Sequence, residues 1–172
     1  MQIVDLVLSI KSNRNFFEHQ NYFKKHPQQI VELIQLVENK EAYPVEEYAS
    51  WILSHVVKTQ RIEVQKYYNQ LIDILFENNN QSSRRNILNT IRYLNITDYR
   101  ESQFIDLLIS YIEDYNTKVA AQVNAIYILA SFVIIYPELK TEVLEIIDLH
   151  LEKKTSSYAA AKRKFISLTR KI

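Results

Sequence analysis

The chain has 172 residues, of which 47% are hydrophobic and 24% charged, the balance of a folded globular domain. It contains no cysteine, which excludes disulfides, thiolate zinc sites and cysteine nucleophiles, and no glycine, which excludes the P-loop, the dinucleotide fingerprint and the nucleophile elbow. A net charge of +1 lacks the basic excess typical of nucleic-acid-binding proteins.

Apolar residues recur at three- and four-residue spacing along almost the whole chain, which is the period of amphipathic helices. Pro27, Pro44 and Pro137 stand where a first helical turn tolerates proline. The pattern predicts ten helices, at residues 2–11, 14–25, 27–38, 44–59, 61–77, 82–95, 100–114, 117–135, 138–153 and 156–170. Asparagine is expected to replace glycine in the left-handed conformation at helix ends, at Asn39, Asn78, Asn95 and Asn116.

Alternate helices repeat a pattern of the form Val-x-x-x-Ala-x-x-Ala-Leu, with substitutions. Its central residues are Ala49, Leu88 and Val123, which are 39 and 35 positions apart, a period that suits two helices per repeat. The sequence therefore predicts an all-α fold, a right-handed α-α superhelix of about five stacked antiparallel helical hairpins that forms a single domain over residues 1–172. The second helix of each hairpin is expected to line one face, at 14–25, 44–59, 82–95, 117–135 and 156–170.

The alanine-centred segment 48–56 resembles the second helix of HEAT and armadillo repeats, and the resemblance covers about residues 14–172. Together with segments 136–140 and 156–163, it is similar to a group of small bacterial HEAT-like proteins, some of which bear the name adenylosuccinate lyase. The signature loop of that lyase superfamily is rich in Ser, Gly, Met, Pro, Lys and Asn, whereas this chain has no Gly and its one Met is Met1. The resemblance therefore implies a helical-repeat architecture. It does not imply lyase activity, although some of the similar proteins bear the name of the lyase.

Trp51 lies about 200° from Ala49 around an ideal helix, away from the apolar stripe. Trp51 and His55 are four residues apart, and the pair is similar to the Trp-x-x-x-Asn groove motif of armadillo proteins, with His55 in the place of Asn. The motif occurs once, because the equivalent positions in the next two repeats carry other residues. Two interpretations stay open: Trp51 packs between hairpins, or it anchors a peptide in a groove.

Ser50, Asn89 and Asn124 occupy one repeat position and are candidates for a polar ladder that pairs with the backbone of a partner. The alternative is that they are ordinary polar residues of helix surfaces. With Trp51 and His55 they form the predicted binding residues of a non-enzymatic scaffold that holds a protein or peptide.

A second hypothesis concerns basic residues on two helices. Arg85 and Arg92 are seven positions apart and share a helix face, and Lys162 and Arg163 follow on the last helix. HEAT-like folds include DNA glycosylases for alkylated bases, so the resemblance implies nucleic-acid binding as an alternative function. The near-neutral net charge favours ordinary ion-paired helices instead.

Neither a catalytic residue, a metal site nor a cofactor is predicted. The four histidines, His19, His26, His55 and His150, form no i, i+4 pair of the kind that binds zinc on a helix. Asp5 interrupts the first apolar run, which has no basic residue before it, and no apolar run is long enough to span a membrane. These features predict a cytoplasmic protein without a membrane partner.

Overall fold

The computed structural model describes residues 2–11, 16–149 and 155–170, and it places them in α-helices, short 3-10 turns and connecting loops. The chain divides into two compact units, Met1–Asn95 and Ile96–Ile172. We describe each unit by itself. No helix in the described ranges is long and apolar enough to cross a membrane.

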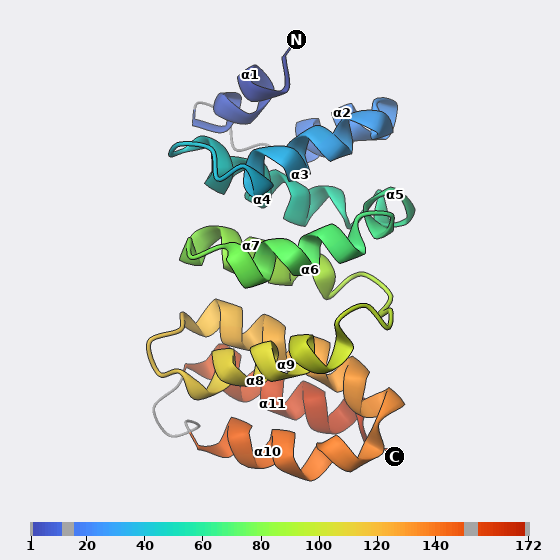
Figure 1. Ribbon diagram of the computed structural model, residues 1–172, viewed down its shortest axis with the longest axis vertical. Helices are drawn as coiled ribbons and strands as arrows, with labels where there is room; N and C mark the ends of the chain where they lie inside the picture. The colour runs from blue at the N-terminus through green and yellow to red at the C-terminus, as the bar shows by residue number, and fades with distance from the viewer. Residues whose placement is uncertain (1, 12–15, 150–154, 171–172) are drawn as a thin grey trace. The chain divides into compact units, whose positions relative to one another are not determined.

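The first unit is built around one central helix, α4 (Val45–Val56). Helix α4 packs against α3 (Ile30–Glu38) on one side and α7 (Gln81–Ile91) on another, and α6 (Tyr68–Glu77) packs against α3 and α7 (Figure 1). Two helical layers result, α3 with α6 and α4 with α7. The two N-terminal helices, α1 (Ile3–Leu8) and α2 (Phe16–Lys25), both contact α4.

The core of the first unit follows from the helical spacing of its apolar residues. Helix α3 buries Ile30, Leu33, Ile34 and Val37, which recur at three- and four-residue intervals and so share one face. Helix α4 buries four residues at the same kind of spacing, Ala49, Ile52, Leu53 and Val56. These two stripes face each other, which explains why the hairpin forms from this sequence.

In the part of the second unit that the structure describes, four α-helices pack in two layers. Helix α8 (Glu101–Glu113) packs against α9 (Val119–Ile135) and α10 (Lys140–Asp148), and α9 packs against α11 (Ser156–Leu168). Helix α9 is apolar nearly all round and is buried along most of its length, as expected for a helix inside a stack. Phe104 of α8 and Phe132 of α9 meet edge to face, with ring centroids 5.9 Å apart.

The expectation of one helix over 61–77 is wrong. Helix α5 (Arg61–Gln65) ends before Tyr67, and α6 begins at Tyr68. The side chain of Gln65 exchanges two hydrogen bonds with the backbone of Asn95, so α5 is held against the end of the α7 segment while α6 packs on α3 and α7. The remaining predicted helices are found near their expected bounds, except that residues 14–15 and 150–153 lie outside the described ranges.

The prediction of left-handed asparagines at helix ends is also wrong. Among the described residues, the positive φ angles belong to Lys40 (53°) and Arg100 (48°). Asn78 is extended instead, and its amide donates a 2.7 Å hydrogen bond to the buried carboxylate of Glu46. Asn80 caps the start of α7 by accepting from two backbone N–H groups. Asparagine is thus used here for its side-chain hydrogen bonds.

Candidate functional site

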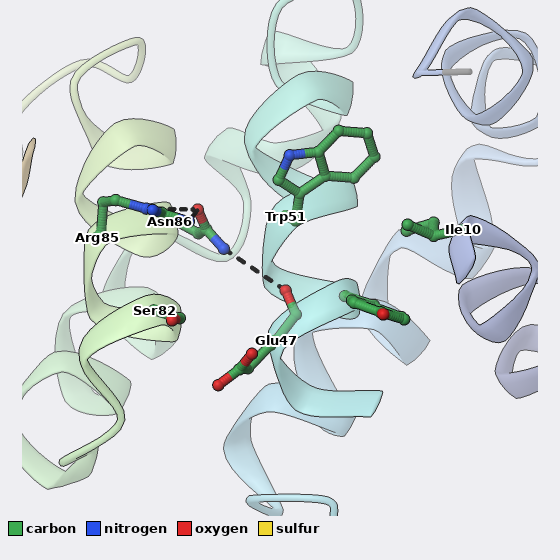
Figure 2. A pocket seen from close by; sticks show the side chains of 7 residues that line it. Ile10, Glu47, Trp51, Ser82, Arg85 and Asn86 are labelled. Atoms are coloured by element: carbon green, nitrogen blue, oxygen red, sulfur yellow. Dashed lines mark hydrogen bonds between the residues drawn. The ribbon is translucent and has the colours of Figure 1, made fainter. Parts of the chain in front are cut away.

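A groove of about 260 Å³ opens on the first unit beside α4 and α7, and Figure 2 shows the side chains around it. Helix α4 contributes three lining residues, α7 contributes three, and the 3-10 turn after α1 (Ser9–Lys11) contributes one. The lining residues are Ile10, Glu47, Tyr48, Trp51, Ser82, Arg85 and Asn86. The groove therefore unites Trp51 and Arg85, which the sequence suggested for two different functions.

Helical geometry explains why these residues lie together. Glu47 and Trp51 are four apart on α4, and Ser82 and Asn86 are four apart on α7, so each pair points to one side of its helix. Because α4 and α7 are adjacent, the two sides line the groove together, and Ile10 lies across α4 from the α7 residues (Figure 2).

A polar seam joins α4 to the segment that carries α7. Asn86 donates from Nδ2 to Ser50 Oγ over 3.0 Å, and Asn80 donates from Nδ2 to Glu47 Oε1 over 3.2 Å. With the Asn78–Glu46 hydrogen bond, three side-chain pairs cross between the two segments. Buried or half-buried hydrogen bonds of this kind fix the register of two helices, because breaking one leaves a desolvated polar group without a partner.

Arg85 is held at the groove by the residue that follows it. Its Nε and Nη2 atoms each lie 3.3 Å from Oδ1 of Asn86, to which they donate (Figure 2). The side chain of Asn86 therefore holds the guanidinium of Arg85 through its oxygen and bonds to Ser50 of α4 through its nitrogen. Sequence reasoning missed Asn86. The repeat could have indicated it, because Asn86 follows Ser50 by 36 positions, which is close to one repeat period and places the two residues on neighbouring equivalent helices.

Trp51 is half-buried and forms part of an aromatic cluster with α2. Its ring centroid lies 4.3 Å from that of His55 and 6.4 Å from that of His19, which it meets edge to face. Phe16 of α2 in turn lies 5.2 Å from His55. Trp51 therefore packs against a helix of the preceding pair and also lines the groove.

His55 contacts Trp51 but is not among the residues that line the groove. Its Nδ1 atom lies 2.9 Å from the backbone oxygen of Trp51. Burial lowers the pKa of His55 below its ordinary value; the hydrogen bond to Trp51 acts in the opposite direction, and the charges of Lys58 and His19 lower it further. The folded state thus favours the neutral imidazole.

This shift predicts a pH dependence of stability. The unfolded chain takes up the proton near pH 6.5, whereas folded His55 resists it, so stability is lost as the pH falls below about 6.5. Urea unfolding of the wild type and of His55→Gln at pH 7.5 and 5.0 measures the effect. The free energy of unfolding of the wild type should fall more than that of the variant. An equal fall in both proteins would show that His55 does not contribute.

The expected ladder of Ser50, Asn89 and Asn124 is not the arrangement found. Ser50 is fully buried and its hydroxyl donates to the backbone oxygen of Glu47 and pairs with Asn86 rather than with Asn89. Asn124 is buried within the second unit, and Asn89 is half-buried on α7. The hydroxyl of Ser50 therefore serves the α4–α7 contact.

The other basic residues make local contacts. The guanidinium of Arg92 lies 5.1 Å from the ring centroid of Tyr93, where Lys58 also contacts the ring. Lys162 forms an ion pair with Asp148, and its neighbour Arg163 is exposed on α11. Arg85 and Arg92 belong to the first unit, whereas Lys162 and Arg163 belong to the second.

A second cavity, of about 390 Å³, lies within the second unit, between α8 and the 3-10 turn Pro137–Leu139. Glu101, Asp106 and Glu138 line it together with Tyr136. The hydroxyl of Tyr136 donates to Glu101, a contact that raises the pKa of Tyr136. In the ranges that the structure describes, no group of His, Cys, Asp and Glu side chains is placed to hold a metal ion. His150 lies outside these ranges.

Antiparallel helix pairs that stack in two layers through their apolar faces define an α-helical repeat protein. A family model of the HEAT repeat domain matches residues 8–168, and the chain belongs to this family. The HEAT-like resemblance and the all-α fold expected from the sequence are thereby confirmed. Comparisons with curated proteins and with solved structures returned no match. HEAT repeat domains typically bind proteins and are usually non-catalytic.

Proposed function

We propose that the protein is a non-enzymatic scaffold that binds an extended segment of another protein or a peptide in the groove between α4 and α7. The observation that carries the proposal is the position of Trp51, whose half-buried ring lines an open groove. Tryptophan is enriched among the residues that contribute most to protein interfaces.

The dimensions of the groove favour a peptide segment over a free small molecule. Pockets that enclose drug-sized ligands typically measure roughly 300–1,000 Å³. A groove of about 260 Å³ is smaller and open to one side, so it suits one or two side chains of a longer partner.

The polar seam prepares the groove for binding. Asn86 accepts hydrogen bonds from Arg85, and Asn80 donates one to Glu47, so these groove residues are held before a partner arrives. A site that is already ordered loses less conformational entropy on binding than a flexible one.

The charges of the groove favour a protein partner over nucleic acid. Glu47 lines the same groove as Arg85, and its carboxylate would repel a phosphate backbone. Lys162 is matched by Asp148 in the second unit. These contacts support mixed polar recognition rather than a continuous basic surface.

Site-specific photo-cross-linking tests the proposal. A photoreactive phenylalanine analogue replaces Tyr48, which lines the groove, or Tyr43, which is 78% exposed and outside it. Irradiation in the cell that makes the protein should give a discrete adduct from position 48 and none from position 43. Trp51→Ala in the position-48 protein should remove that adduct, because the anchoring ring is gone.

Two outcomes would contradict the proposal. An adduct that forms equally from both positions would reflect chance collisions. An adduct from position 48 that survives Trp51→Ala in a folded variant would show that the ring does not anchor the partner.

A further inference from the structure

The groove contains two opposite charges that are held separately. Asn86 accepts hydrogen bonds from Arg85, and Asn80 donates a hydrogen bond to Glu47. Figure 2 shows the two side chains at different levels of the groove, Arg85 beside Asn86 and Glu47 nearer Ser82. The guanidinium of Arg85 and the carboxylate of Glu47 are therefore each held by the side-chain amide of a different asparagine.

The order of these levels follows from the helices. Glu47 precedes Trp51 by one turn of α4, and Ser82 precedes Arg85 by about one turn of α7. A chain that runs through the groove along the two helices consequently meets a negative side chain at the level of Glu47 and a positive side chain at the level of Arg85. The ring of Trp51, on α4, is an apolar part of the groove lining.

An extended peptide matches this arrangement because its successive side chains point to opposite sides. One side chain would face Arg85, and the next would face Glu47. An acidic residue pairs with a guanidinium through two parallel hydrogen bonds, and a lysine or arginine pairs with a carboxylate.

We propose that the groove selects an extended segment in which an acidic and a basic residue are neighbours, with an apolar residue beside them on Trp51. The inference rests on the proposed function and names the chemistry of its partner. The acidic side chain binds Arg85 and the basic side chain binds Glu47. Segments with two like charges are rejected, because one of the two would face a group of its own sign.

The single tryptophan of the chain provides a local readout. The indole N–H resonance of Trp51 in a ¹H–¹⁵N spectrum reports on the groove and on the adjoining contacts of the ring with His19 and His55. The probes are four synthetic decapeptides with leucine beside a central Asp-Lys, Lys-Asp, Asp-Asp or Lys-Lys pair, each titrated to millimolar concentration. Both mixed peptides should bind about fivefold more tightly than either like-charged peptide, because each like-charged peptide loses one exposed ion pair, which contributes up to about that factor, and gains a like-charge repulsion.

Charge reversal in the protein makes the test specific. Glu47→Lys should shift the preference to Asp-Asp, and Arg85→Glu should shift it to Lys-Lys. Glu47→Gln and Arg85→Gln serve as matched controls that keep a side-chain amide at each position. In these controls the mixed peptides should lose most of their advantage while the unbound indole resonance stays in place.

The possible failures are distinguishable. Four peptides that bind with equal affinity, or reversal variants that keep the original preference, would overturn the charge-pair inference and leave peptide binding at Trp51 intact. A resonance that no peptide shifts would overturn the inference and the proposed function together.

Discussion

Replacing Phe132 with alanine is expected to lower the free energy of unfolding of the second unit by about 3–5 kcal/mol, as is typical when a buried phenylalanine is truncated. Phe132 is fully buried on α9 and meets the ring of Phe104 edge to face. The loss combines the removed apolar contacts, the cavity left in a packed core and the missing aromatic pair.

A neighbouring residue provides the control for this prediction. Ile134 lies on the same helix but is 53% exposed, so Ile134→Ala should cost less than about 1 kcal/mol. Urea denaturation followed by circular dichroism compares the two variants with the wild type. Similar losses for both would mean that α9 is not buried along the face that carries Phe132.

The helices could be predicted because their information is local. The spacing of apolar residues predicts both that a helix forms and which face it buries, as it does at Ile30, Leu33, Ile34 and Val37. The absence of glycine leaves long periodic segments uninterrupted. The break between Gln65 and Tyr68 could not be predicted in the same way, since the residue that holds Gln65 is Asn95, thirty positions away.

Part of the groove lining had been singled out in the sequence. The angle of Trp51 set it apart from the apolar stripe, and the structure places its half-buried ring at the groove. Its neighbour Arg85 came from a different hypothesis, because spacing within one helix does not reveal which helices lie side by side. Ser50 was expected on a helix surface, but it is fully buried and accepts a hydrogen bond from Asn86 of another repeat.

The failed prediction of left-handed asparagines has a related cause. Asparagine was expected to supply the left-handed conformation that glycine usually provides, yet Lys40 and Arg100 adopt it. The side chains of Asn78 and Asn80 instead donate hydrogen bonds to Glu46 and Glu47 of α4. A residue type that suits several roles is assigned by its tertiary partner, which a single sequence does not display.

Replacing Trp51 with alanine is expected to weaken partner binding by roughly thirtyfold or more, equivalent to about 2 kcal/mol, the loss that defines a dominant interface residue. Trp51→Phe should lose less, because it keeps a ring on the groove and against His55. Since Trp51 also packs on α2, thermal unfolding of each variant must first show a folded protein.

The most direct test of the scaffold account is the dissociation constant for the partner segment captured at Tyr48, measured with the wild type, Trp51→Ala and Ile62→Ala. Ile62 is 79% exposed on α5 and does not line the groove, so it controls for the loss of an exposed apolar side chain. We expect a roughly thirtyfold weaker constant for folded Trp51→Ala and an unchanged constant for Ile62→Ala. An unchanged constant for folded Trp51→Ala would contradict the account.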